Sequence, residues 1–332
     1  MTVKKDGLRE NGEGGRRPLF VPSDLQYVAA WALTAPLHVL PGRWRAGLLH
    51  RLSRVLGAAW YRSGLGDVQR VRRNLQRLFS GDEGPEELES EVRRALRLAA
   101  WNTMVVDLLP ALRERHAASL LQIEGTAHLD AAIQAGQPVL LLGAHYGPFA
   151  YAVAAGLRAR GYPVTQVGRA AWPKAAGTRF YRRVYWPRVE RLLRHLAVRD
   201  LEVEGTDVLP DMLRLGEVPL LLPDEYIVFQ PGERPAPDAM PLPLFKWMVY
   251  VRVQELRLAK GQGARLIAAL PQPTGDGRRI VLAPLAAGSP EQELAAFVAR
   301  LEERVRLSPG LWRDLRRSDL WERLRPPEEA TI

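Results

Sequence analysis

The sequence predicts an α/β fold, in which a mostly parallel sheet is flanked by helices and preceded by an N-terminal helical section that associates with a membrane. The first observation is that short, wholly apolar runs, such as residues 139–142 and 218–222, alternate with longer helical stretches. Strands that are apolar throughout are buried on both faces, as in parallel sheets covered by helices. The second observation is that net positive charge is concentrated before residue 80, in a section that also holds a long uncharged stretch containing tryptophan.

Glycine and proline bound several of the predicted elements. The strand at 139–142 ends at Gly143, and the helix at 149–160 ends at Gly161. Pro219 weakens the start of the strand at 218–222, because proline cannot donate a hydrogen bond to a sheet. The other predicted elements are, in order, a helix at 85–116, a strand at 163–167, a helix at 206–215, a Pro-rich loop at 231–243, strands at 265–270 and 279–283 joined by a turn at 274–277, and a helix at 291–307.

Most of the net charge of +10 lies in residues 1–80, which contain 14 Lys and Arg but only five Asp and Glu. A nucleic-acid-binding protein is expected to carry its basic patch on the folded body, whereas residues 81–332 are nearly neutral. A basic run at 179–194 interleaves Arg with Tyr and Trp, so phosphate binding, nucleic-acid binding and a solvated helix face are all open for that run. The overall distribution favours a membrane lipid partner and disfavours nucleic acid.

Two N-terminal segments are apolar enough to contact a membrane. Residues 25–42 carry no Lys, Arg, Asp or Glu, but 18 residues is the lower limit for a spanning helix and polar side chains interrupt the segment. Residues 43–62 place Leu and Trp at helical spacing opposite Arg, which is typical of a helix lying in an anionic lipid interface. A helix packed on the protein's own core would have the same periodicity, so both interpretations are open.

These patterns divide the chain into four sections. We expect residues 1–17 to be a disordered tail, because they lack the apolar core of a signal peptide, and residues 18–80 to form basic, amphipathic, membrane-associating helices. Residues 81–310 form the α/β domain, and residues 311–332 form a C-terminal helix and tail. The chain contains no cysteine and no pair of His residues at metal-ligand spacing, so we expect no metal site.

Candidate catalytic residues follow the two most apolar strands. His145 lies in a Gly-flanked turn after the strand at 139–142, and Asp224 and Glu225 follow the strand at 218–222. Because the carboxyl ends of parallel strands meet at one edge of a sheet, these side chains can approach each other. An imidazole near a carboxylate can act as a general base. A hydrogen-bonded turn residue without catalytic function is the alternative interpretation of His145.

The turn around His145 resembles that of the lauroyl/myristoyl acyltransferases of lipid A biosynthesis, within the lysophospholipid acyltransferase superfamily. The pattern in that family is an apolar strand followed by G-x-H-x-G-N-W-E. Gly143, His145 and Gly147 match it, while Phe149 replaces the Trp. Further similarities, in the order and spacing of the family, are Arg73, Asn74, Leu75, Phe79, Gly125, Arg169, Asp224, Trp312, Arg316 and Arg317.

The resemblance implies transfer of a fatty acyl group from acyl carrier protein or acyl-CoA to a hydroxyl of a lipid or glycolipid. It implies no cofactor beyond that acyl donor, and a location on the cytoplasmic face of the bacterial inner membrane, bound peripherally or by a single anchor. His145 would be the base and Asp224 or Glu225 its partner. The residues expected to bind substrate are Gly143, Tyr146, Gly147, Phe149 and Arg169, with Arg169 contacting phosphate.

One departure concerns the acid of the family signature, H-x4-D/E. The residue five after His145 is Ala150, so the expected carboxylate is missing. Impairing the equivalent acid of a Ser-His-Asp triad costs about 10⁴ in rate. Three explanations are open: Asp224 or Glu225 has taken over the role, the protein has lost catalysis and retains a groove for lipid or acyl chains, or the fold supports a different chemistry.

Overall fold

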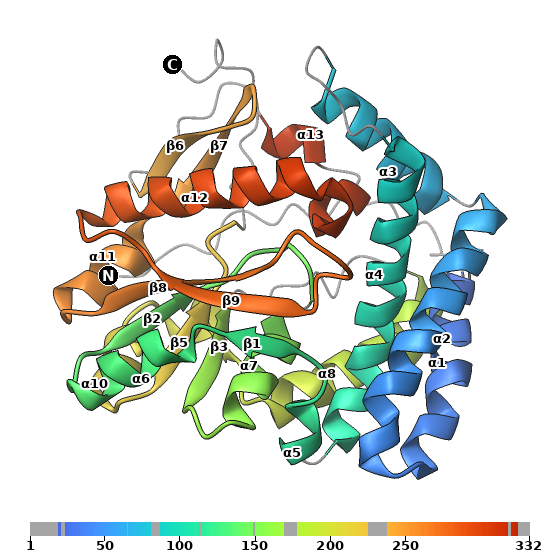
Figure 1. Cartoon of the computed structure of the whole chain (residues 1–332), viewed down its shortest axis with the longest axis horizontal. Helices are drawn as coiled ribbons and strands as arrows, with labels where there is room; N and C mark the ends of the chain where they lie inside the picture. Colours follow the sequence, from blue (N-terminus) through green and yellow to red (C-terminus); the bar gives the residue numbers. More distant parts are fainter. Residues whose placement is uncertain are drawn as a thin grey trace.

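The computed structural model describes residues 19–20, 24–64, 66–80, 87–112, 114–148, 150–168, 178–224, 238–317 and 320–324. Helices enclose a seven-stranded sheet on both faces (Figure 1). The strand order is β1-β9-β8-β2-β5-β3-β4, and every neighbouring pair is parallel except β8 and β9. The predicted α/β class is therefore confirmed. The strands are β1 Gln122–Glu124, β2 Val139–Leu142, β3 Val164–Gly168, β4 Arg199–Asp200, β5 Val218–Leu221, β8 Arg265–Pro271 and β9 Arg279–Pro284.

Two apolar clusters lie on the two faces of the sheet, because side chains of a strand alternate between its faces. Leu141 of β2 points into one cluster, with α6 and α7, and Leu140 and Leu142 point into the other, with α10, α11 and α12. These helices are α6 Thr126–Gln134, α7 Ala150–Arg158, α10 Val208–Arg214, α11 Gln254–Gly261 and α12 Pro290–Leu307.

A small antiparallel hairpin corrects one prediction. The Pro-rich loop expected at 231–243 is wrong for its last residues, because β6 (Ala239–Leu244) pairs with β7 (Trp247–Arg252). Pro241 and Pro243 are exposed while Leu242 and Leu244 are buried, so the prolines occupy the outer face of a two-stranded ribbon. Proline is tolerated in such strands, and the alternation with Leu was the signal for the hairpin. Residues 225–237 lie outside the described part of the chain.

The N-terminal section consists of helices packed against the α/β domain. They are α1 Leu25–Thr34, the 3-10 helix η2 Ala35–Val39, α2 Gly42–Ser63, α3 Gly66–Leu78 and α4 Leu88–Leu108. The helix predicted at 43–62 is confirmed as α2. The continuous helix predicted at 85–116 is wrong after Leu108, where Pro110 interrupts it; the 3-10 helix η3 (Leu109–Ala111) and the short α5 (Glu114–Ala117) follow.

One face of α2 packs on the protein's own core and the other face is exposed, so the structure confirms the packed helix and membrane contact stays a prediction. Leu49 and Leu56 are buried in the core, whereas Trp44 and Val55 are exposed.

The first half of α4 packs into one apolar cluster and its second half into the other, so this helix joins the two sides of the domain. Among the described residues, none of the helices is both long and apolar enough to cross a membrane.

Residues 308–317, which we call the C-terminal strap, pass beside the carboxyl end of β2. The strap contains the 3-10 helices η5 (Pro309–Leu311) and η6 (Arg313–Arg316), and α13 (Leu320–Arg323) follows it. Asn74 of α3 donates hydrogen bonds to the carbonyls of Leu315 at 2.8 Å and Arg317 at 3.3 Å. Glu91 of α4 accepts one from the backbone N–H of Gly310 at 2.7 Å. The strap is therefore held by α3 and α4.

Candidate functional site

The site lies where the parallel neighbours β2 and β5 end. Leu142 pairs with Leu221, and the backbone N–H of Gly143 extends the ladder by donating to the Leu221 carbonyl at 2.8 Å. This register brings the residues that follow each strand to the same edge of the sheet, which is where ligands bind in open parallel sheets. His145 and Asp224, 79 residues apart in the sequence, meet there.

His145 and Asp224 make two hydrogen bonds with each other. The Asp224 carboxylate accepts from the His145 backbone N–H at 2.5 Å and contacts the ring nitrogen Nδ1 at 3.1 Å. The Asp224 side chain is fully buried, while the His145 side chain is 14% exposed. Because a carboxylate only accepts, Nδ1 must carry the hydrogen. Nε2 is then the basic nitrogen of the neutral ring, on a side chain that solvent reaches.

The charges around His145 set its protonation. Burial alone would lower the pKa of the imidazole, but the charge of Asp224 and the hydrogen bond to it outweigh burial, and the net pKa lies above the ordinary value of 6.5. Arg313 opposes this effect and Asp314 adds to it. The ring is therefore biased toward accepting a proton, as a general base requires.

Two glycines let the turn pack closely on the rest of the sheet. A Cβ at Gly143 would lie 2.9 Å from Leu222 Cδ2. Gly147 has φ +77°, a left-handed value, and a Cβ there would lie 2.4 Å from Pro271 Cγ. In the structure these glycines allow close contact between protein segments; their predicted contact with substrate stays a prediction.

Tyr146 anchors the turn in the core. Its side chain is 1% exposed, and its hydroxyl donates to the Arg304 carbonyl at 2.8 Å. Burial raises its pKa far above the ordinary value of 10. Tyr146 also forms an isolated antiparallel bridge with Trp312 of the strap. This burial favours a structural role over the predicted contact with substrate.

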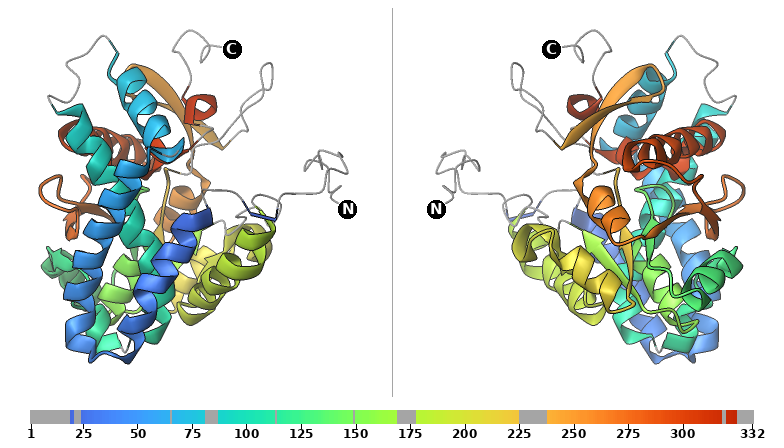
Figure 2. Two further views of the ribbon diagram at one scale, coloured as in Figure 1. Left: turned by 90° about the vertical axis from the view of Figure 1, so that its right-hand side faces the viewer. Right: turned by 90° about the vertical axis from the view of Figure 1, so that its left-hand side faces the viewer.

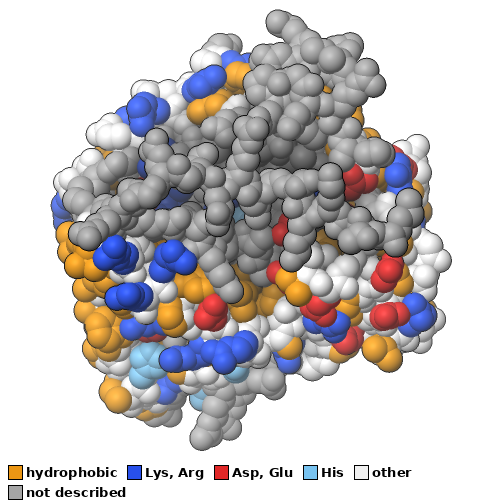
Figure 3. Space-filling model, turned by 180° about the vertical axis from the view of Figure 1, so that it is seen from behind, with side chains coloured by type: hydrophobic (Ala, Val, Ile, Leu, Met, Phe, Trp, Pro, Cys, Tyr) orange, Lys and Arg blue, Asp and Glu red, His pale blue; other side chains and the backbone are white. Residues whose placement is uncertain are grey.

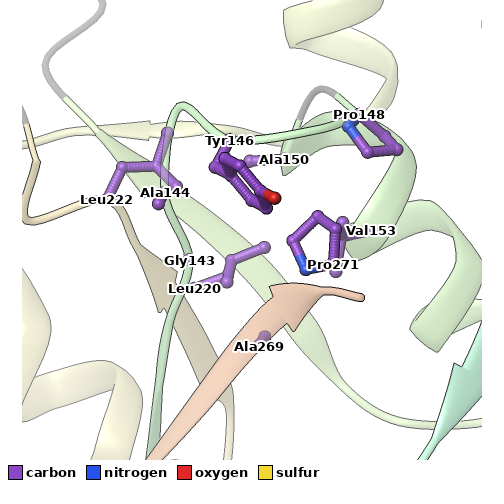
Figure 4. A pocket seen from close by; sticks show the side chains of 10 residues that line it. All are labelled: Gly143, Ala144, Tyr146, Pro148, Ala150, Val153, Leu220, Leu222, Ala269 and Pro271. Atoms are coloured by element: carbon purple, nitrogen blue, oxygen red, sulfur yellow. The ribbon is translucent and has the colours of Figure 1, made fainter. Parts of the chain in front are cut away.

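Ala150 begins α7 and lines a small apolar pocket (Figure 4). The cavity measures about 10 Å³, which is room for about one water molecule. Ala150 is 5% exposed, so a longer acidic side chain would enter apolar surroundings. The carboxylate next to His145 comes from the end of β5 instead of α7. Lining residues are Gly143, Ala144, Tyr146, Pro148, Ala150, Val153, Leu220, Leu222, Ala269 and Pro271.

The sequence from residue 21 to residue 313 matches the family model of the bacterial lipid A biosynthesis acyltransferases. The chain belongs to this family. The match supports an acyltransferase kind of function, in agreement with the resemblance found around His145. No curated protein matches the chain.

Three of the predicted site residues lie outside the part of the chain that the structure describes. They are Glu225, Phe149 and Arg169. Of the two acids predicted as partners of His145, the structure brings Asp224 to it. Within the described ranges, no three His, Asp or Glu side chains form a group that could hold a metal ion.

Arg313 is a neighbour of His145 that sequence reasoning missed. Its backbone N–H donates to the His145 carbonyl at 2.8 Å, and its charge affects the pKa of His145. Trp312 and Arg316, on either side of it, match the family pattern, whereas Arg313 does not belong to that pattern. No local pattern marks Arg313, because its position depends on backbone pairing between segments 168 residues apart.

We expect Asp224→Asn to lower the pKa of His145. The substitution removes the charge that raises this pKa, while burial and Arg313, which lower it, remain. The measurement is an NMR titration of the His145 ring in both proteins. Asp211→Asn, at an exposed position of α10, is the matched control and should leave the pKa unchanged. An unchanged His145 pKa in folded Asp224→Asn would contradict the described pairing.

Proposed function

We propose that the protein is an O-acyltransferase in which His145 is the general base and Asp224 orients it. The observation that carries the proposal is the His145–Asp224 pair at the carboxyl edge of the sheet, in a member of an acyltransferase family. The pair leaves Nε2 as the basic nitrogen of a side chain that is 14% exposed, while the Asp224 side chain is fully buried.

The proposed reaction moves an acyl group from a thioester to a hydroxyl. Nε2 of His145 takes the hydroxyl proton while the oxygen attacks the thioester carbonyl carbon, so a C–O bond forms and the carbonyl electron pair moves to oxygen. When this intermediate collapses, the C=O bond re-forms and the C–S bond breaks. The departing thiolate takes the proton from His145, so the products are an ester and a thiol.

Asp224 would contribute at two stages of this reaction. Before transfer, it keeps the hydrogen on Nδ1 and so selects the tautomer in which Nε2 can accept a proton. During transfer, its buried negative charge stabilises the imidazolium that forms. This arrangement replaces the absent acid at Ala150, and it supports the first of the three explanations for that departure.

For the substrates we propose the classes that the family resemblance implies. The donor is a fatty acyl thioester of acyl carrier protein or coenzyme A, and the acceptor is a hydroxyl of a lipid A-type glycolipid or a lysophospholipid. The step needs no metal or redox cofactor. Phe149 and Arg169 keep their predicted roles in substrate binding, with Arg169 on a phosphate.

We further propose that α1, η2 and α2 contact the cytoplasmic face of the inner membrane, because their outer surface is rich in aromatic and apolar residues. Trp31 is 47% exposed, Trp44 61% and Val39 85%. Such large exposed side chains favour an interfacial position, where tryptophan is stable. Figure 2 shows α1 and α2 at the outside of the molecule, against α4.

Arginines of the neighbouring helix α8 (Trp186–His195) extend this surface. The guanidinium of Arg188 lies 4.7 Å from the Trp31 ring centroid of α1. The ring centroids of Tyr27 in α1 and Tyr185, the residue before α8, are 4.3 Å apart, so α1 packs against the start of α8. Arg191 is exposed on the same helix. Figure 3 shows Lys and Arg side chains among hydrophobic ones on the left of the rear view. This position favours lipid phosphate as the partner of the basic run at 179–194.

Acyl transfer by the purified protein tests the catalytic proposal. We expect His145→Ala to reduce turnover by roughly 10²- to 10⁴-fold, the usual contribution of a general base, and Asp224→Asn to cause a loss of similar size. The assay uses long-chain acyl-acyl carrier protein and acyl-CoA with glycolipid and lysophospholipid acceptors.

The same assay tests the missing acid at Ala150. Ala150→Glu should not raise turnover and should lower the melting temperature, because it buries a carboxylate in an apolar pocket.

The controls of this assay separate catalysis from binding. His145→Ala should retain binding of a non-hydrolysable acyl thioester analogue, because burial of the acyl chain does not depend on the imidazole. Unchanged turnover in folded His145→Ala would refute the assigned base. Binding of acyl analogue without turnover in the wild-type protein, for every donor and acceptor, would favour a lipid-binding protein that has lost catalysis.

Flotation with liposomes tests the proposed membrane surface. Trp31→Ala combined with Arg191→Glu should weaken binding to phosphatidylglycerol vesicles about tenfold or more, because a cation near an anionic surface contributes about 1 kcal/mol. The effect should shrink at high salt. The matched control is Leu215→Ala with Arg214→Glu, exposed residues at the end of α10 on another side of the molecule. Equal losses in both double variants would contradict the assignment.

A further inference from the structure

The C-terminal strap pairs with the turn that carries His145. The backbone N–H of Gly147 donates to the Leu311 carbonyl at 2.7 Å, and that of Arg313 donates to the His145 carbonyl at 2.8 Å. These two bonds flank the antiparallel bridge between Tyr146 and Trp312. The pattern places Arg313 directly opposite His145.

Pairing of this kind determines which side chains share a face. Residues opposite each other in an antiparallel pair point to the same side, and the next pair points to the other side. Tyr146 and Trp312 are each 1% exposed and point into the core. His145 and Arg313 therefore share the opposite face, and both side chains are partly exposed.

Electrostatics agree with this position. The positive charge of Arg313 lowers the pKa of His145, so the two groups are close enough to interact. Burial lowers the pKa of Arg313 itself to about 10, against the opposing effects of Asp314 and Asp224. Arg313 is still a cation at neutral pH. The face thus carries a base, a carboxylate beside the base and a positive charge.

The strap that carries Arg313 is fixed by several contacts with α3 and α4. Its backbone carbonyls accept hydrogen bonds from two residues of α3, and its ends contact acidic and basic side chains of both helices. Because the backbone on both sides of Arg313 is held in this way, the strap keeps Arg313 opposite His145 and loses little conformational entropy when a ligand binds there. The anchoring residues are Asp67, Arg70, Asn74, Glu91 and Arg94.

We propose that Arg313 is a third catalytic residue, which binds the carbonyl oxygen of the acyl thioester and stabilises the negative charge that develops there. The proposal rests on the acyl-transfer function proposed above. As Nε2 of His145 accepts the hydroxyl proton and the C–O bond forms, the carbonyl electron pair moves to oxygen, next to the guanidinium. When the C–S bond breaks, the pair returns to the C=O bond and the thiolate takes the proton from His145.

Two charges arise together in this step, and the site has a fixed group for each. Asp224 is next to the ring that becomes positive, and Arg313 is on the face where the oxygen becomes negative. Fixed charges directed at developing charges contribute strongly to catalysis because they need no reorganisation during the reaction. Arg also offers paired N–H donors in a planar fork, which a Lys ammonium does not.

The test compares Arg313→Gln and Arg313→Lys with the wild-type protein in acyl transfer. We expect Arg313→Gln to lower kcat by roughly 10²-fold, the usual cost of removing one donor to an oxyanion, while the KM for acyl donor changes little. Arg313→Lys should recover part of kcat because it keeps the charge. Arg257→Gln, at an exposed position of α11, is the matched control and should leave kcat unchanged.

A second measurement reports on the position of Arg313 without turnover. NMR titration of His145 should give a higher pKa in Arg313→Gln than in wild type, because Arg313 lowers this pKa while Asp224 and Asp314 continue to raise it. In the pH profile of kcat/KM, the acidic limb should move to higher pH by the same amount. A purely structural role of Arg313 would shift neither.

The possible outcomes distinguish the role of Arg313 from the proposed acyltransferase function. Wild-type kcat in Arg313→Gln, with His145→Ala inactive, would overturn the assignment of Arg313 and leave the acyltransferase function standing. An unchanged His145 pKa in Arg313→Gln would also overturn the assignment. So would the same loss of kcat in Arg313→Lys as in Arg313→Gln, if the melting temperature also falls by the same amount in both. Absence of transfer by the wild-type protein would overturn the proposed function and, with it, the role of Arg313.

Discussion

The buried carboxylate of Asp224 is the constraint on which the arrangement of the site depends. A charge removed from water is costly unless hydrogen bonds and opposite charges compensate it. Asp224 meets this requirement by accepting from both the backbone and the ring of His145. The same contacts fix the turn after β2, the tautomer of the imidazole and the distance between the ends of β2 and β5. A structural requirement of the fold thus produces the geometry that a general base needs.

Other parts of the chain are organised around this edge of the sheet. Tyr151, at the start of α7, interacts electrostatically with both Arg313 and Tyr185, and Tyr185 packs against Tyr27 of α1. An aromatic group therefore connects the surroundings of His145 with the helices proposed to contact the membrane.

The sequence was sufficient to predict the fold and to place His145 near two candidate acids, Asp224 and Glu225. Apolar strands ended by turns predict a parallel sheet, and the rule that such strands end at one edge brings His145 near Asp224. Arg313 could not be predicted, because only tertiary pairing of the strap places it opposite His145. Ala150 shows a similar limit: the sequence names two candidate acids after the strand at 218–222 for the missing carboxylate, and the structure shows that Asp224 contacts His145 and that an apolar pocket lies at Ala150.

The central claim is that His145 and Asp224 act as one unit, and a double-mutant cycle on acyl transfer tests it most directly. Turnover is measured for His145→Ala, Asp224→Asn and the protein carrying both changes. Residues that act as a unit show strongly non-additive losses, so the double variant should be about as slow as the slower single variant. Losses that multiply in the double variant would show that the two residues act independently and would contradict the account.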